Sequence, residues 1–260
     1  MKVLLVEDHR QYADLIQEKL ASEFGFDVTV ATDPTAAHGH LTAHRYDVVV
    51  VDVLYRKLSE SYNQQREQAR SSLSELRPFN ISGLSTLREV ATRSPETAMV
   101  VWTSGDPNRT LHIVMAHQTF RVRAFCSKES TYSDIATAIN AAAERRPHVD
   151  VTLRPFLPRA TLPPLGDVLF REVRWRAIWR ALAAGSPEHE VTARMTNYEV
   201  QTVRKAMAPM AESLSILSPR LTSRRQPLNI LSSYATFHWE FFLDRAVVEM
   251  FPHTSANSRS

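Results

Sequence analysis

The chain has 260 residues, of which 43% are hydrophobic and 23% charged, and this length favours two domains. It contains no apolar run of about 18 residues, which excludes an ordinary membrane-spanning helix. Its single cysteine, Cys126, excludes a framework of internal disulfides and is typical of a reducing compartment. Because no signal peptide precedes the first strand pattern, we expect a cytoplasmic protein with no membrane partner.

The net charge of +3 is unevenly distributed along the chain. Residues 1–150 carry 17 Lys and Arg against 19 Asp and Glu, whereas residues 151–260 carry 14 against 9. A mildly basic C-terminal half is compatible with a nucleic-acid partner. The same excess is also compatible with an ordinary solvated surface, so charge alone leaves both interpretations open.

Strand and helix patterns alternate from the N-terminus onwards. An apolar run at residues 3–6 is followed by helical spacing over residues 11–24, a strand pattern at 27–31 and a helix that Pro34 opens. The next strand pattern, at residues 48–51, is a run of four valines, which is typical of a strand buried on both faces. This alternation predicts an α/β domain with a doubly wound parallel sheet.

Polar side chains stand where each predicted strand ends. In chain order they are Glu7, Asp8, Asp52, Thr103, Ser104 and Lys128. Parallel sheets place their chemistry beyond the carboxyl ends of the strands, so we expect these groups at one edge. Neighbouring carboxylates repel one another unless a cation neutralises them, and hard oxygen ligands suit Mg²⁺. Acid pair, aspartate, hydroxyl and lysine, in that order, indicate phosphoryl transfer to Asp52. Alone, Asp52 would equally suit a strand-terminating turn.

The segments KVLLVEDH, DVVVVD, VVWTSG and AFCSKES resemble the receiver domain of two-component response regulators over roughly residues 1–146. The resemblance implies a flavodoxin-like sheet of five parallel strands and phosphorylation by a sensor histidine kinase. The implied site residues are the phosphoacceptor Asp52, the Mg²⁺ ligands Glu7, Asp8 and Asp52, the phosphoryl contacts Thr103 and Lys128, and the switch residues Thr103 and Phe125.

Residues 56–80 depart from the receiver pattern. Arg56 stands where receivers often have a proline, and the glycine that opens the next helix is Gly83, so these residues form an insertion. Apolar residues recur in it near helical spacing. Two interpretations remain open: a mobile surface loop, or a lid over Asp52 that restricts access of the kinase.

The rest of the first domain continues the alternation. The pattern predicts a helix at 83–92, a strand at 98–102, a helix at 106–120, a strand at 122–127 and a helix at 133–145. The spacing between Thr103 and Lys128 is a few residues longer than in typical receivers. Five prolines then indicate a semi-rigid linker at residues 147–166.

The second domain is predicted to be helical. We expect a helix over residues 167–184 that Gly185 ends, and a second that starts with Ser186 as cap and Pro187. A capping box of Thr196 and Glu199 predicts the start of a third helix. Two short helices joined by a tight turn predict an all-α helix-turn-helix domain.

Residues 167–215 resemble the LuxR/NarL-type DNA-binding domain, through ALAAGSPEHEVTARM and VQTVRKAMAPMAESL. The resemblance implies that the DNA-facing residues are Gln201, Thr202, Arg204 and Lys205. Three features depart from the family: the turn is one residue longer, Thr192 replaces an alanine, and Pro209 lies inside the recognition helix, where it would kink it. An interaction domain that has lost DNA binding is the open alternative.

Residues 216–251 extend beyond the usual end of that family. An apolar helix is predicted at 229–251, and it would either pack on the second domain or form a dimer contact. Residues 252–260 are expected to be a disordered tail.

Taken together, these patterns and resemblances predict a DNA-binding response regulator and not an enzyme, because self-phosphorylation accounts for each catalytic-looking group. Phosphorylation of Asp52 would alter homodimerisation and therefore affinity for DNA. Two alternatives remain: an atypical regulator that no kinase drives, and a signalling adaptor whose C-terminal region binds protein.

Overall fold

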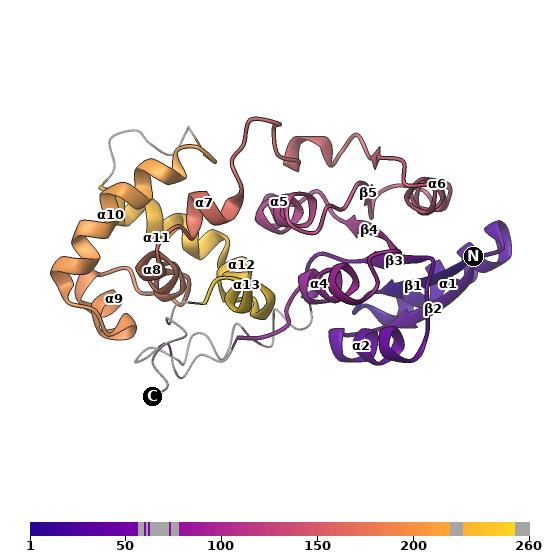
Figure 1. Ribbon diagram of the computed structural model, residues 1–260, viewed down its shortest axis with the longest axis horizontal. Coiled ribbons are helices and arrows are strands. Elements are labelled where there is room, and N and C mark those ends of the chain that lie inside the picture. The colour runs from indigo at the N-terminus through magenta and orange to yellow at the C-terminus, as the bar shows by residue number, and fades with distance from the viewer. Residues whose placement is uncertain (57–59, 61, 63–72, 74–77, 219–225, 253–260) are drawn as a thin grey trace. The chain divides into compact units, whose positions relative to one another are not determined.

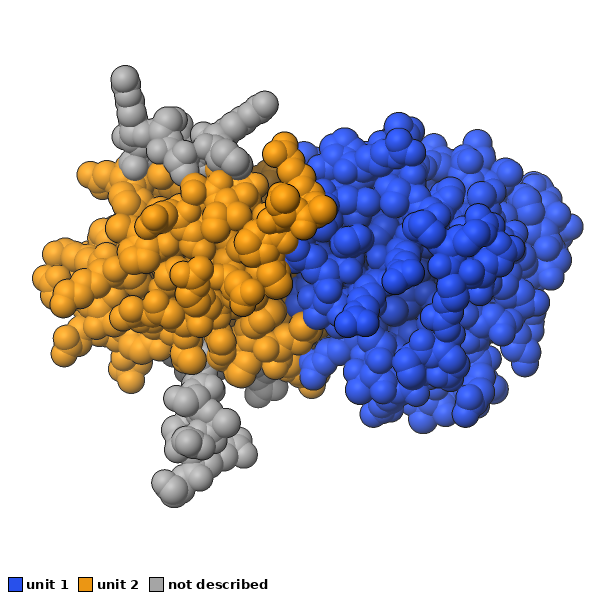
Figure 2. Space-filling model, turned by 45° about the horizontal axis from the view of Figure 1, so that its top comes forward, with its two compact units in different colours: residues 1–59, 80–158 blue, residues 60–79, 159–260 orange. Residues whose placement is uncertain are grey.

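The computed structural model describes residues 1–56, 60, 62, 73, 78–218 and 226–252, which form two compact units (Figures 1 and 2). Unit 1 contains residues 1–59 and 80–158, and unit 2 contains residues 60–79 and 159–260. Within this described part, no helix is both long enough and apolar enough to cross a membrane.

Unit 1 is built on a parallel sheet with the strand order β2-β1-β3-β4-β5-β6. Its strands are β1 Lys2–Val6, β2 Asp27–Ala31, β3 Val48–Val51, β4 Ala98–Thr103, β5 Ala124–Ser127 and β6 His148–Val149. The expected doubly wound sheet is confirmed, but the expectation of five strands was wrong by one. The sixth strand lies in the predicted linker, where the amide of His148 donates to Arg123 O at 3.0 Å and so satisfies the open edge of β5.

Helices flank the sheet of unit 1 (Figure 1). They are α1 Arg10–Phe24, α2 Pro34–Ala43, α4 Leu84–Arg93, α5 Thr110–Gln118 and α6 Tyr132–Ala143, with a short 3₁₀ turn at Pro107–Arg109 before α5 and another at Arg154–Phe156. Helices α1 and α6 pack together, and α4 contacts both α2 and α5. The core between the sheet and α1/α6 includes Val3, Leu5, Ile16 and Ile139, all buried.

Local chemistry explains where these helices begin and end. Gly25 has a φ of 69°, a left-handed conformation that glycine adopts without strain, and it ends α1 as predicted. The Asp33 carboxylate accepts from the amides of Thr35 at 2.8 Å and Ala36 at 2.9 Å, which caps α2. Thr131 and Asp134 form a reciprocal capping box that starts α6.

The strand register places the polar residues that follow the strands at one edge of the sheet. Val6 pairs with Val51, Val51 pairs with Val101, and Thr103 pairs with Ser127. Because the strands are parallel, the residues at or just beyond these pairs share the carboxyl edge of the sheet.

Unit 2 is helical over its described residues. Its helices are α7 Leu165–Leu169, α8 Val173–Ala183, α9 His189–Thr196, α10 Val200–Leu214, α11 Pro227–Phe237, α12 Trp239–Leu243 and α13 Arg245–Met250. The single helix predicted at 167–184 is two helices. The chain breaks at Phe170, whose carbonyl accepts from Arg176 Nε at 2.9 Å instead of continuing the helix. Gly185, with a φ of 97°, follows the end of α8 as expected.

The predicted starts of the two helix-turn-helix helices were wrong. The N-cap position of α9 is Glu188, whose side chain makes no capping bond, and not Ser186, which is buried with its carbonyl accepting from Thr192 Oγ1 at 3.2 Å. Thr196 is the last residue of α9 and donates to Thr192 O at 2.8 Å, so it forms no capping box with Glu199. Asn197 turns the chain with a φ of 56°, which its short polar side chain tolerates.

The apolar segment predicted as one helix at 229–251 forms three, α11 to α13. His238 lies between α11 and α12. Asp244 separates α12 from α13, because its carboxylate accepts from Ala246 N at 2.7 Å and caps α13. Both α11 and α12 pack against α8, which confirms the interpretation that this segment packs within the chain.

The insertion predicted at residues 56–80 lies mostly outside the described residues. Its described members Tyr62, Leu73 and Phe79 belong to unit 2. The Tyr62 ring lies 4.5 Å from that of Phe79 and 5.9 Å from that of Trp239. Tyr62 is 1% exposed, so at this position the insertion is packed and is not a free surface loop.

Candidate functional site

Three buried carboxylates meet at the carboxyl edge of the sheet in unit 1. Glu7 and Asp8 follow β1, Asp52 follows β3, and one oxygen of each lies within 4.8 Å of the others. Asp52 is 2% exposed. The structure therefore brings together the acid pair and the aspartate that the sequence singled out.

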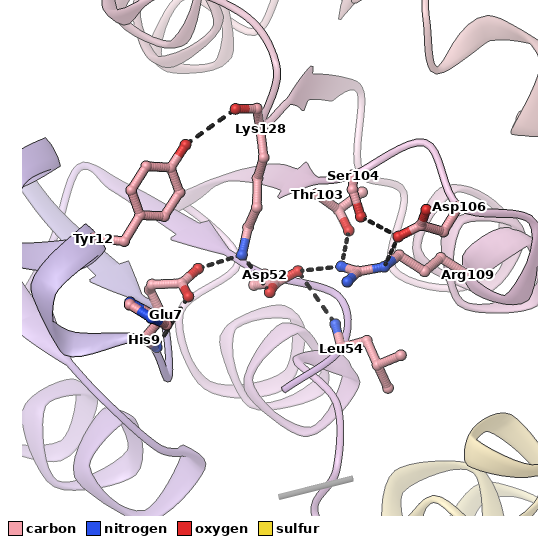
Figure 3. A network of polar contacts seen from close by, with 10 residues as sticks. All are labelled: Glu7, His9, Tyr12, Asp52, Leu54, Thr103, Ser104, Asp106, Arg109 and Lys128. Atoms are coloured by element: carbon pink, nitrogen blue, oxygen red, sulfur yellow. Dashed lines mark hydrogen bonds and ion pairs between the residues drawn. The ribbon is translucent and has the colours of Figure 1, made fainter. Parts of the chain in front are cut away.

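Lys128, the first residue after β5, bridges two of these carboxylates (Figure 3). Its Nζ lies 2.5 Å from Glu7 Oε2 and 2.6 Å from Asp52 Oδ2. The ammonium stands 5.2 Å from the centre of the Trp102 ring, and the Lys128 carbonyl accepts from the Tyr12 hydroxyl at 3.0 Å. These contacts fix the lysine between the strand ends.

The protonation states follow from burial and charge. Burial raises the pKa of the Glu7 carboxyl, and the nearby Asp52 charge raises it further, while Lys128 opposes both. Burial alone would lower the pKa of Lys128, but the carboxylates of Asp52 and Glu7 outweigh burial and raise it. Lys128 is therefore a stably charged ammonium at neutral pH.

Arg109 is part of this site and was not predicted from the sequence. Its Nη1 donates to Asp52 Oδ1 at 3.1 Å and to Thr103 Oγ1 at 2.8 Å (Figure 3). Its Nε lies 3.3 Å from Asp106 Oδ2, and the side chain is only 12% exposed. The residue ends the short turn before α5, within the stretch that is longer than in typical receivers.

The predicted switch residues are both buried. Thr103 ends β4 and presents its hydroxyl to Arg109. Phe125 lies in β5, with its ring 6.1 Å from that of His117 on α5. The two therefore sit on neighbouring strands, one at the site and one against the helix that follows Arg109.

The backbone around Asp52 is tightly enclosed. Asp52 Oδ1 accepts from Leu54 N at 3.3 Å, and Leu54 forms a bridge with Ser82. A Cβ added to Gly83 would lie 2.2 Å from Asp52 O and 2.1 Å from Val51 Cγ1. Only glycine fits there, which agrees with the sequence interpretation of Gly83.

The donor set fits a hard divalent cation. Glu7, Asp8 and Asp52 offer carboxylate oxygens close together at the edge of the sheet, and such oxygens are the ligands that Mg²⁺ prefers. Lys128 and Arg109 already supply two positive charges to the same cluster. With three carboxylates and two cations, the group carries a net charge of about −1.

The predicted DNA-facing residues lie on the solvent side of α10. Gln201, Arg204 and Lys205 are exposed and Thr202 is half-buried, while the opposite face, with Val203 among its members, is buried. Arg204 Nη2 pairs with Glu190 Oε1 of α9 at 2.8 Å. The helix continues through Pro209, so its first turns are intact as expected.

Comparisons with known proteins agree with this architecture. No protein-family model and no curated protein sequence matches the chain. The RcsB response regulator of Salmonella typhimurium is similar in structure, with a TM-score of 0.52 and 16% identity over 90% of this chain and 98% of that one. The two-component response regulator RcsB in its DNA complex gives a TM-score of 0.50, with the same identity and coverage.

A receiver domain from Clostridium thermocellum covers 55% of this chain at 23% identity, with a TM-score of 0.42. The RcsB matches cover nearly the whole chain, so the likeness extends beyond the parallel sheet. At these identities it concerns the fold: this chain has the fold of a full-length response regulator, a receiver-like α/β unit followed by a helical unit.

Proposed function

We propose that the chain is a response regulator that is phosphorylated on Asp52 and controls transcription by binding DNA. The observation that carries the proposal is the meeting of Glu7, Asp8, Asp52 and Lys128 at one sheet edge. Thr103 joins them through Arg109, in a chain with the fold of a full-length response regulator.

Phosphoryl transfer would start from the Asp52 carboxylate. One of its oxygens attacks the phosphorus of a phosphohistidine on a sensor histidine kinase, the P–N bond breaks, and its electron pair stays on the imidazole nitrogen. Lys128 and Thr103 would hold phosphoryl oxygens. Mg²⁺ bound by Glu7, Asp8 and Asp52 would neutralise charge that develops on the transferred group. Hydrolysis of the acyl phosphate by water returns the carboxylate.

Mass spectrometry after incubation with Mg²⁺ and acetyl phosphate tests this chemistry. We expect one added phosphoryl group on the wild-type chain and none on Asp52→Ala. Asp14→Ala is the matched control, because Asp14 is an exposed carboxylate of α1 whose described partner is Arg10, outside the Asp52 cluster. A phosphoryl group that persists in Asp52→Ala would contradict the assignment.

DNA binding is proposed for the exposed face of α10. The exposed Arg204 and Lys205 would reach phosphates or base edges, and Gln201 and Thr202 stand one turn earlier in the helix. A homodimer would present two such helices to neighbouring half-sites. Fluorescence anisotropy with duplex DNA tests this: Lys205→Ala should reduce the slope of log K against log salt by about 1. Failure to bind any DNA at low salt would favour the adaptor function.

One observation favours a regulator that is not driven by phosphorylation: Arg109 already occupies Asp52 Oδ1. For such a protein, Asp52→Asn would leave DNA affinity unaltered, with and without acetyl phosphate. Under the main proposal, acetyl phosphate changes the DNA affinity and the sedimentation coefficient of the wild type only.

A further inference from the structure

We propose that Arg109 is a resident counter-ion that holds the unphosphorylated Asp52 site and competes with both the divalent cation and the phosphoryl group. The inference deepens the proposed function and rests on it for the phosphoryl step, but its cation step stands alone. It starts from the position of one guanidinium nitrogen, Nη1, between Asp52 Oδ1 and Thr103 Oγ1 (Figure 3).

That position is the one a phosphoryl group would need. A group bonded to Asp52 and held by the Thr103 hydroxyl must lie between these two side chains, where Arg109 Nη1 now lies 3.1 Å from one and 2.8 Å from the other. Because Asp52 Oδ2 is occupied by Lys128 at 2.6 Å, both carboxylate oxygens are engaged by cations. Arg109 therefore competes with a metal or a phosphoryl group for Oδ1.

The net charge of the site also predicts that Arg109 and Mg²⁺ compete. Without Arg109 the cluster of three carboxylates and Lys128 would carry about −2, which a divalent cation neutralises fully. Arg109 adds one positive charge, which the exposed Asp106 carboxylate offsets only in part because solvent screens it, so a bound Mg²⁺ would be repelled by a guanidinium that is mostly enclosed. Arg109 thus weakens Mg²⁺ binding by repulsion as well as by occupying a ligand oxygen.

A second carboxylate, that of Asp106, is available to a displaced Arg109. Asp106, which is exposed, already lies 3.3 Å from Arg109 Nε, so the guanidinium can rotate away from Asp52 and keep an ion pair. Ser104 donates to the same Asp106 carboxylate at 2.5 Å and holds that acceptor in place. The displaced arginine would then stand at the rim of the site.

Calorimetric titration with Mg²⁺ tests the cation step directly. We expect Arg109→Ala to bind Mg²⁺ about tenfold or more tightly than wild type, because one charge and one competitor are removed. Arg109→Lys should fall between the two, since it keeps the charge but not the fork that reaches both partners. Arg45→Ala is the control: it removes the same charge at a side chain that is 93% exposed.

Arg109→Gln is a second neutral variant, to be used if Arg109→Ala does not fold. Its amide removes the charge but can still donate a hydrogen bond to Thr103. Equal or weaker Mg²⁺ affinity in folded Arg109→Ala and Arg109→Gln would overturn the proposal, whatever the phosphorylation assay shows. In the acetyl phosphate assay we expect the same variants to gain the phosphoryl group faster than wild type. If neither they nor wild type gains one while Mg²⁺ affinity rises, the proposed phosphorylation fails and the counter-ion assignment stands.

Discussion

At the scale of single residues, those site residues that directly follow a strand could be predicted from the sequence. Asp52 and Lys128 each follow a short apolar run, and the register of a parallel sheet places such residues together. Arg109 lies in no such position. It reaches Asp52 from a 3₁₀ turn, and a turn gives no periodic signal. The extra length between Thr103 and Lys128 was the only hint that something unusual stands there.

Gly83 is a residue whose role can be tested by a single methyl group. We expect Gly83→Ala to destabilise unit 1 by about 1–3 kcal/mol and to slow phosphorylation of Asp52, because the new Cβ would overlap Val51 and the Asp52 carbonyl. Urea unfolding and the acetyl phosphate assay measure the two effects.

Gly39→Ala is the matched control for that substitution. Gly39 lies inside α2, and a Cβ there would meet no atom within 4 Å. It should raise stability by about 0.5–1 kcal/mol, since alanine favours helix over glycine. Equal effects of the two substitutions would contradict the enclosure of Asp52 by Gly83.

Cys126 gives a prediction about reactivity. The thiol is buried in β5, and burial raises its pKa to about 12. Because the thiolate is the reactive form, Cys126 in the native protein at pH 8 should not react with an aromatic disulfide reagent. In guanidinium, Cys126 should react and release one equivalent of the reagent's thiol. Rapid labelling of the native chain at pH 8 would show that β5 opens locally.

At the scale of elements, the sequence predicted most helices and strands of unit 1 but misplaced helix starts in unit 2. Thr196 and Glu199 have the spacing of a capping box, yet the structure uses Asn197 in a left-handed turn and ends α9 at Thr196. A sequence signature for a cap competes with every other way of turning the chain, and tertiary packing decides between them. Thr192 illustrates this at the other end of α9, since its buried hydroxyl donates to Ser186 O and so connects the helix to the segment before it.

Helix α10 gives the prediction at this scale. Pro209 lies inside the helix on an exposed position, where it removes one backbone hydrogen bond. We expect Pro209→Ala to stabilise unit 2 by about 1–2 kcal/mol, less than the full helix penalty because proline also restrains the unfolded chain. Denaturant unfolding followed by circular dichroism measures it. Glu212→Ala, at another exposed position of α10, should stay within about 0.5 kcal/mol.

A decrease in stability for Pro209→Ala would show that unit 2 uses the altered helix geometry. DNA affinity of the same variant separates structure from function. Because Arg204 and Lys205 precede Pro209, we expect the proposed contacts of these residues with DNA to be unaffected by the substitution.

At the scale of the whole molecule, the assignment of the insertion could not be predicted. Apolar residues recur in residues 56–80 near helical spacing, but such periodicity identifies a face that can be buried and never the surface that it packs against. The chain leaves unit 1 after residue 59, enters unit 2, and returns at residue 80. Residues that follow Asp52 in the chain therefore belong to the helical unit. The sequence-based prediction placed the boundary between the two domains at residues 147–166 and assigned these residues to the first domain.

This arrangement makes unit 2 dependent on a segment that lies between β3 and α4 in the chain. We expect Tyr62→Ala to destabilise unit 2 by about 3 kcal/mol, because its ring packs on Phe79 and Trp239 in a buried cluster. Calorimetry should show a lower transition temperature for the helical unit, and the emission of Trp239 should change before unfolding.

Phe237→Ala is the control, since it also removes an aromatic ring of unit 2 but from a position that is 52% exposed. It should shift stability by less than about 1 kcal/mol. Equal shifts for the two variants would mean that the insertion contributes no more to unit 2 than a surface side chain does. If Tyr62→Ala alone is destabilising, a residue of the segment between β3 and α4 contributes to the core of the helical unit. Deleting residues 58–78 should then change the DNA affinity even in a chain that carries Asp52→Ala.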